Sequence, residues 1–318
     1  MSNPSATLSP PATVTVGRWL PGMLGLAAIW GSSFLFIKVG VSELHPLYVA
    51  LGRVASGALA LVIVLLVTRD GLPREPVVWA HNAVIAVIGI AMPFSLFAYG
   101  EQRISSMLAG IWNSMTPLVV LPLAVFLFRT EQLTRRRVLG LALGLAGALV
   151  IPGVWRGVGG SSLAGQLMCL GAASCYGVTI PYTKKFIASR PGSGFSMSAS
   201  QLLLASVVLA VAAPLTTQSV PDVTQLSGHV VAAVLALGAL GTGLAFVINL
   251  RNIRLVGAST ASMVTYLIPV FAVLIGVIVL HEHLQWFQPV GAAVVLVGVA
   301  VSQGVIGRRP AKVPVVAA

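Results

Sequence analysis

The sequence predicts an all-α integral membrane protein with ten transmembrane helices, arranged as two inverted five-helix repeats. The first observation is composition: 57% of the residues are hydrophobic and only 8% are charged. A soluble domain carries about a quarter charged residues, so this chain cannot cover a water-facing surface. The second is a series of apolar runs near the roughly 20 residues that a membrane-spanning helix needs. The third is that the chain resembles itself across its two halves.

The internal repeat shows in residues 112–131, WNSMTPLVVLPLAVFLFRTE, and 264–282, VTYLIPVFAVLIGVIVLHE. Further pairs lie at nearly constant separations: Pro117 with Pro269, Glu131 with Glu282, Gly140 with Gly291, Gly147 with Gly298, and Trp30-Gly31 with Tyr176-Gly177. If each half holds five spans, an odd number, the second half must be inverted relative to the first. Inverted repeats with broken helices are the sequence signature of a transporter.

The apolar runs predict spans in order along the chain: 19–38, 46–67, 79–99, 106–128, 137–154, 165–187, 196–214, 229–250, 257–280 and 286–306. The first repeat is then 19–154 and the second 163–306, joined by the Gly/Ser-rich linker 155–162. Residues 1–18 are rich in Ser, Pro and Thr and are predicted to be disordered. They lack a signal-peptide pattern. Residues 307–318 form a basic tail.

The net charge of +12 comes from basic residues that this topology places mostly on one side. Fifteen fall there: Arg18, Arg69, Arg74, Arg129, Arg135, Arg136, Arg137, Lys184, Lys185, Arg190, Arg251, Arg254, Arg308, Arg309 and Lys312. Three fall on the other: Lys38, Arg103 and Arg156. This positive-inside bias predicts a multi-pass protein of the bacterial inner membrane with both termini cytoplasmic. The charges suit contact with anionic lipid and are not a nucleic-acid footprint.

Pro117 and Pro269 are predicted to lie mid-helix in the fourth span of each half. A proline frees the carbonyl four residues earlier, here of Asn113 and Thr265. In hydrocarbon such a carbonyl must find a partner or line a wet cavity. Both residues are therefore candidates for a substrate site. The alternative is a proline kink healed by a neighbouring Ser or Thr.

Three charged residues are candidates for a gate or a binding charge: Arg53, Glu101 and Lys38. An arginine inside a membrane span is functional, paired or snorkelling to the interface. Arg53, whose repeat counterpart is Gln201, has Glu101 as a candidate partner, although Glu101 could instead pair with Arg103. Lys38 and its counterpart Lys184 either anchor helix ends or attract a carboxylate at a cavity mouth.

Other features favour structural roles. Glu131 and Glu282 are interpreted as contacts that fix helix ends, with a coupling-ion site as the alternative. Neither the His281–His283 triplet nor the Cys169 and Cys175 pair has a spacing typical of a metal site. The segment 241–243, GTG, is interpreted as a packing cluster. Gly140 and Gly144 form a GxxxG motif that either joins helices within the chain or makes a dimer, so a monomer or weak homodimer is expected.

Three segments carry a family resemblance: WGSSFLFIK, YGEQRISSMLAGIWNSMTPL and GTGLAFVINLRNIRLVGASTASMVTYLIPVFAVLIGVIVLHE. They resemble the tandem EamA domains of the drug/metabolite transporter superfamily, over about residues 20–306. The resemblance, which extends to YddG-type amino-acid exporters, implies a central cavity lined by the first, third and fourth helices of each half. It implies these substrate-binding residues: Trp30, Ser33, Tyr99, Trp112, Asn113, Tyr176, Thr179, Asn249, Thr265 and Tyr266.

Together these patterns predict a secondary transporter that exports small metabolites, mainly amino acids including aromatic or apolar ones, by alternating access. No acidic residue is placed at the membrane midplane, so neutral or zwitterionic solutes are expected over cations, with weak or absent proton coupling. A passive facilitator or channel for small neutral solutes is the alternative, and an intramembrane enzyme a remote one. No cofactor or metal is expected. ATP is not expected to drive transport directly, because the chain shows no Walker motif. The expected partners are a small-molecule substrate and membrane lipids.

Overall fold

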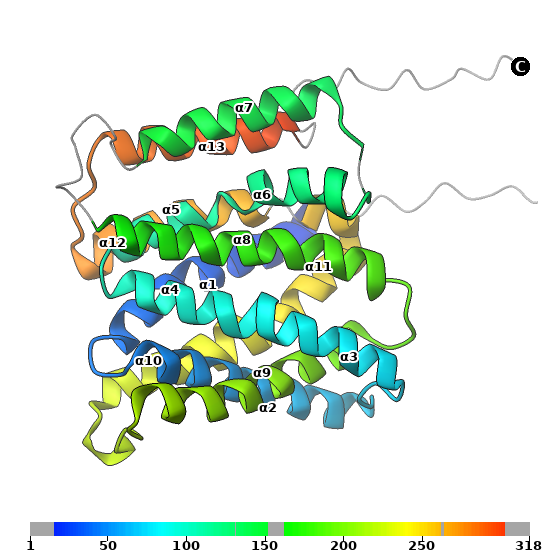
Figure 1. Ribbon diagram of the computed structural model, residues 1–318, viewed down its shortest axis with the longest axis vertical. Helices are drawn as coiled ribbons and strands as arrows, with labels where there is room; N and C mark the ends of the chain where they lie inside the picture. Colours follow the sequence, from blue (N-terminus) through cyan, green and yellow to red (C-terminus); the bar gives the residue numbers. More distant parts are fainter. Residues whose placement is uncertain (1–15, 131, 152–161, 262–263, 303–318) are drawn as a thin grey trace, which may run out of the picture.

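The computed structural model describes residues 16–130, 132–151, 162–261 and 264–302. These residues form helices and loops without a strand (Figure 1). The first half holds α1 (Val16–Gly40), α2 (Pro46–Thr68), α3 (Pro76–Ile85), η1 (Ala86–Ala91), α4 (Met92–Glu101), α5 (Ser106–Asn113), α6 (Thr116–Pro122), η2 (Leu123–Leu127) and α7 (Arg135–Val150). The second half holds α8 (Leu163–Phe186), α9 (Gly194–Thr217), η4 (Val223–Gln225), α10 (Gly228–Gly238), η5 (Ala239–Leu244), α11 (Ala245–Ala261), α12 (Val264–Leu280) and α13 (Phe287–Ser302).

Seven helical spans in the described residues are long and apolar enough to cross a membrane. They are α1, α2, α3 to α4, α5 to η2, α8, α9, and α10 with its continuation into α11. Three shorter α-helices remain in this part of the chain: α12 and α13, which hold the apolar stretches Leu267–Leu280 and Phe287–Val301, and α7, which has 16 residues. The prediction of an all-α membrane fold is confirmed. Each repeat has one helical span for each predicted span.

Several helices begin where a hydroxyl side chain can satisfy a free backbone N–H of the first turn. Ser105 accepts from the Leu108 amide before α5, and Thr134 accepts from the Arg137 amide before α7. Ser162 and Ser193 do the same before α8 and α9. In hydrocarbon or at its edge these amides have few other partners, so the polar residues between apolar runs fix where each span starts.

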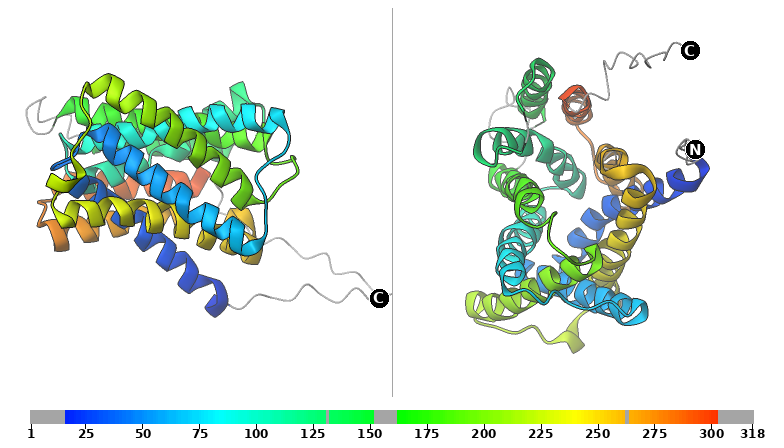
Figure 2. Two further views of the ribbon diagram at one scale, coloured as in Figure 1. Left: turned by 90° about the horizontal axis from the view of Figure 1, so that it is seen from below. Right: turned by 90° about the vertical axis from the view of Figure 1, so that its right-hand side faces the viewer.

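The two halves pack as an inverted pair around an approximate two-fold axis. The second spans, α2 and α9, pack against each other, and so do the fifth spans, α7 and α13. These two pairs of equivalent helices lie at opposite ends of the long axis of the molecule (Figures 1 and 2). Between them, α1 packs on α12 and α8 on α5 and α6, which pairs each first span with the other half's fourth. Each helix therefore buries its surface mainly on the opposite repeat.

The predicted position of one proline and two predicted segment boundaries are wrong. Pro117 does not lie mid-helix: α5 ends at Asn113, and Pro117 stands in the first turn of α6. The proline ring is tolerated there because first-turn amides need no helical acceptor. Residues 257–261 belong to α11 and not to the next span. The helix α1 already begins at Val16, inside the segment predicted to be disordered.

Pro269 lies inside α12 as predicted. Residues 1–15, nearly all of the linker 155–162, and the tail 307–318 lie outside the described residues, as does Glu131.

Candidate functional site

A cavity of about 620 Å³ lies between the two halves. Ligand pockets typically measure about 300–1,000 Å³, so it has room for a small metabolite. The first half supplies Trp30, Ser33, Phe34, Ile37, Arg53, Gly89, Ile90, Phe94, Phe97, Asn113, Ser114, Thr116, Pro117, Val120, Leu121, Ala124 and Arg137. The second half supplies Tyr176, Ile180, Gly241, Thr242, Phe246, Thr265, Ile268, Leu296 and Val299.

A π-helical segment from each half borders the cavity. Gly89 and Ile90 come from η1, and Gly241 and Thr242 come from η5. Such single-turn π segments occur often at functional sites, because they interrupt the regular helical hydrogen bonds. The glycine-rich sequence 241–243 was interpreted as packing only. A Cβ atom on Gly241 would lie 2.9 Å from Ser33 Oγ, so this segment both packs closely on α1 and forms part of the cavity wall.

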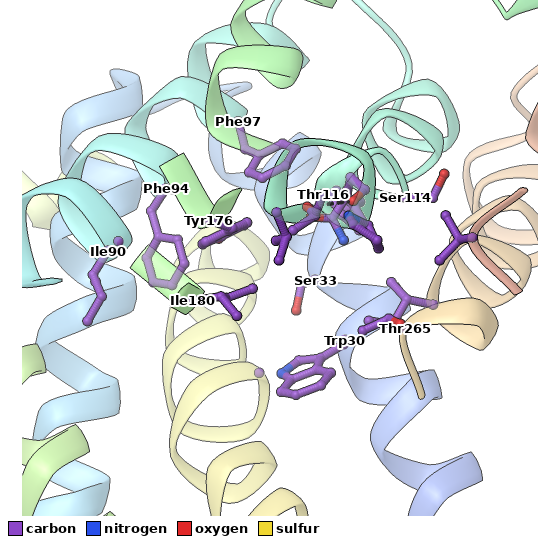
Figure 3. Close-up of a pocket in the computed structure, with 18 of the residues that line it drawn as sticks. Trp30, Ser33, Ile90, Phe94, Phe97, Ser114, Thr116, Tyr176, Ile180 and Thr265 are labelled. Atoms are coloured by element: carbon purple, nitrogen blue, oxygen red, sulfur yellow. Dashed lines mark hydrogen bonds between the residues drawn. The ribbon is translucent and has the colours of Figure 1, made fainter. Parts of the chain in front are cut away.

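Aromatic side chains form much of the wall (Figure 3). Trp30 and Tyr176 were predicted to lie there, whereas Phe94 and Phe97 were not. Phe97 also contacts Tyr176, with ring centroids 6.3 Å apart. The phenylalanines went unrecognised because an apolar residue in a membrane span has the same sequence signal whether it faces lipid or a cavity.

Arg53 is the buried charge on the cavity wall, with 9% of its surface exposed. Its guanidinium carbon lies 3.7 Å from the ring centre of Phe94, and its Nε donates to Thr242 Oγ1 at 3.2 Å. Gly238 lets α10 pack closely on α2 beside Arg53, since a Cβ there would lie 2.4 Å from the Arg53 carbonyl oxygen. Arg53 therefore faces the interior and does not snorkel.

The broken fourth span places Asn113, Ser114, Thr116 and Pro117 along the cavity. The Asn113 carbonyl accepts a hydrogen bond from Thr116 Oγ1 at 2.8 Å. The expected free carbonyl is thus healed by a neighbouring hydroxyl, which was the alternative interpretation. Asn113 still lines the cavity through the break, and Thr265 lines it from the start of α12.

Four predicted site residues do not line the cavity. Tyr99 lies against His45, with ring centroids 5.5 Å apart. Trp112 donates from Nε1 to Gln166 Oε1 at 3.2 Å, and Thr179 donates to the Cys175 carbonyl at 3.0 Å. Asn249 is half-buried on α11. Each belongs to a predicted cavity helix but lies on another face of it. The side chain of Tyr266 lies outside the described residues.

Lys38 and Glu101 also lie away from the cavity wall. Lys38 Nζ donates to the carbonyl oxygens of Glu101 and Ile104, at 2.6 and 2.8 Å, and so caps the end of α4. Of the two alternatives for Lys38, the structure therefore shows the helix-end anchor and not a charge at the cavity mouth. The Glu101 carboxylate is fully buried, and neither oxygen has a hydrogen-bond partner among the described residues. It bonds neither Arg53 nor Arg103, whose Nη1 donates instead to the Tyr99 carbonyl.

Glu282 caps a helix of the opposite half. Its carboxylate accepts from the Ser106 amide at 2.8 Å, from Ser106 Oγ at 3.0 Å and from the Met107 amide at 3.0 Å. An acidic side chain suits these free amides and the positive end of the α5 dipole. Within the described residues no three His, Cys, Asp or Glu side chains gather as a metal site.

The fold is that of a multi-pass membrane protein, with two inverted halves around a cavity of solute size. The chain belongs to the EamA-like transporter family, whose model matches it twice, over residues 17–152 and 163–303.

Relatives support this assignment. The chain is 26% identical to the uncharacterized transporter YoaV of Bacillus subtilis, over 91% of this chain and 97% of that protein. It is 28% identical to the uncharacterized inner membrane transporter YedA of Escherichia coli K12, over 80% of each chain. A solved structure titled only as a crystal structure of a protein is similar in fold, with a TM-score of 0.61 and 22% identity, over 90% of this chain and 98% of that one.

Proposed function

We propose that this protein is a secondary transporter that exports small metabolites across the bacterial inner membrane, with amino acids of apolar or aromatic character as the main substrates. The two inverted halves rock about the central cavity and open it to each side in turn. One observation carries the proposal: a cavity of about 620 Å³ is lined by both halves. Relative movement of the halves would therefore change access to it.

The cavity wall supports a solute with an apolar body and a few polar groups. Aromatic rings occupy much of it, and Ser33, Asn113 and Thr265 add hydrogen-bonding groups. Small-molecule sites typically combine apolar walls with a few placed polar groups. Export and amino-acid specificity are the properties that the resemblance to YddG-type proteins implies.

A passive facilitator that acts as a channel, with the same cavity open to both sides at once, is the second candidate. Counterflow in proteoliposomes separates the two, because only a carrier exchanges labelled external solute against unlabelled internal solute. We expect counterflow with a panel of radiolabelled amino acids, led by aromatic and branched ones. Solute entry that rises linearly with concentration, without counterflow, would identify a facilitator. No movement of any solute in the panel would contradict the proposal.

A further inference from the structure

Arg53 places a positive charge on the cavity wall, and most of its hydrogen-bond donors are not used by the described part of the protein. Only its Nε is engaged, by Thr242 Oγ1. Among the described residues no hydrogen bond or ion pair engages the two terminal nitrogens, and they are not among the fully buried unpartnered polar atoms, so they keep some accessible surface at the cavity wall. A guanidinium remains protonated in proteins. A buried charge without a partner is costly, so the terminal nitrogens need water or a ligand from the cavity.

The guanidinium is held in place before a ligand arrives. The guanidinium carbon lies 3.7 Å from the Phe94 ring centre, and Nε donates to the Thr242 hydroxyl, so two contacts from different helices restrain the group. The two terminal N–H groups form a fork that matches the two oxygens of a carboxylate. This geometry favours a planar anion over a single hydroxyl or amide oxygen.

The two halves differ at this point. Gln201, the repeat counterpart of Arg53, donates from Nε2 to Asn82 Oδ1 at 3.0 Å and does not line the cavity. Arg53 and Gln201 thus each form a hydrogen bond to the third span of the opposite half, but only Arg53 lines the cavity. The positive charge sits on one side of it, which orients a bound anion.

No described acidic residue lines the cavity to balance Arg53. Glu101 interacts with it electrostatically but lies outside the cavity wall. The second basic residue on the wall, Arg137, is half-exposed in the first turn of α7 and is hydrogen-bonded to the Gln132 carbonyl. An ammonium group would find no opposite charge here, and the Asn113 carbonyl already accepts from Thr116.

We propose that Arg53 is the carboxylate anchor of the cavity. The solutes are then small monocarboxylates with an apolar or aromatic body, in which an α-amino group is tolerated but not required. This inference rests on the proposed function, since it names the substrate class of the same cavity. It differs from recognition by Asn113 and Thr265 alone, which would make no distinction between an acid and its amide.

Binding to the purified full chain in detergent tests this proposal with four matched probes: 3-phenylpropionate, L-phenylalanine, L-phenylalaninamide and phenethylamine. The parent protein should bind the first two at least about tenfold more tightly than the last two, because a hydrogen bond to a charged group contributes about 1.5–3 kcal/mol and 1.4 kcal/mol is tenfold. Arg53→Gln should abolish that preference and leave acid and amide equal. Arg53→Lys, which keeps the charge but loses the fork, should show an intermediate preference.

Arg103→Gln is the matched control, because Arg103 is an exposed arginine that bonds the Tyr99 carbonyl away from the cavity. It should keep the parent's preference. The acid-to-amide ratio is measured within one variant, so partial loss of folded protein does not change it. If Arg53→Gln fails to fold, the ratio in Arg53→Lys decides.

A parent that binds the amide and amine as tightly as the acids would overturn the Arg53 proposal while leaving the cavity a solute site. So would a preference unchanged in Arg53→Gln and Arg53→Lys. If the parent bound none of the four probes, the monocarboxylate class would be overturned. Counterflow with the wider amino-acid panel would then test the proposed function separately.

Discussion

Gly147 and Gly291 lie against each other in a reciprocal contact between α7 and α13. A Cβ atom on Gly147 would lie 2.7 Å from the Gly291 carbonyl oxygen, and one on Gly291 would lie 2.9 Å from the Gly147 carbonyl oxygen. Their repeat counterparts, Gly298 and Gly140, are also in close contact, because a Cβ atom on Gly298 would lie 2.6 Å from the Gly140 carbonyl oxygen. Such reciprocity is what a two-fold axis produces. The GxxxG motif of Gly140 and Gly144 therefore packs within the chain.

Gly147→Ala should destabilise the protein by about 1–3 kcal/mol, the usual cost of overpacking a tight interface. The added methyl group meets backbone atoms of α13, which cannot rotate away. Thermal unfolding in detergent measures the change. Gly25→Ala is the control, because no atom lies within 4 Å of the added methyl. Equal melting temperatures for the two variants would show that α7 and α13 do not pack this closely.

Glu282→Gln should weaken the connection between the halves. The carboxylate accepts two backbone amides and one hydroxyl at the start of α5, and hydrogen bonds to a charged group contribute about 1.5–3 kcal/mol. We expect a loss of that size in unfolding free energy. The adjacent exposed His283 provides the control variant His283→Gln, which should leave stability unchanged. A stable Glu282→Gln with altered transport would instead favour a coupling role.

Asn113→Ala and Thr265→Val should each weaken solute binding a few-fold, since one lost hydrogen bond costs on the order of 1 kcal/mol. Both residues line the cavity. Affinity for a transported amino acid, measured on purified protein, decides this. Asn249→Ala is the comparison, because this asparagine lies outside the cavity wall and should bind as the parent does. Parent-like affinity in both cavity variants would place the site elsewhere.

Both termini should lie in the cytoplasm, because the basic residues between spans favour that side. Fusions of a reporter that is active only in the periplasm should give no signal at either end. The same reporter fused within the loop between α1 and α2, which this topology places in the periplasm, is the positive control and should give a signal. Periplasmic activity from either terminus would reverse the orientation of the whole bundle.

Stability should fall at low pH through Glu43, in the loop between α1 and α2. The Ser227 hydroxyl and amide donate to its carboxylate and hold the pKa of Glu43 below its usual value of 4.5. A lowered folded-state pKa means that the contact stabilises above about pH 4.5, and that this contribution is lost as pH falls through the folded value. The melting temperature of the parent should therefore exceed that of Glu43→Gln at pH 6 and converge with it near pH 3. A constant difference across this range would rule out the contact.

Local patterns in the sequence determined the membrane class, the placement of most spans and the repeat. Runs such as 46–68 are too apolar for water, and their length matches the bilayer. Pro117 and Pro269 marked the fourth spans. Pro117 does accompany a break in its span, although it lies in the first turn of α6 and not at a mid-helix kink. The physical reason is local: a missing amide and a bulky ring act on the same turn whatever the rest of the fold does.

Which face of each helix meets the cavity was decided only by the tertiary structure. Trp30 and Trp112 carry the same sequence signal, yet Trp30 lines the chamber while Trp112 bonds Gln166. Phe94 and Thr242 gained their roles from Arg53, which lies far from both in sequence. In a soluble helix the polar face identifies the outside, but in a membrane protein lipid and core are both apolar. Helix rotation is then set by close packing, through contacts such as Gly238 on α2, and those depend on the opposite repeat.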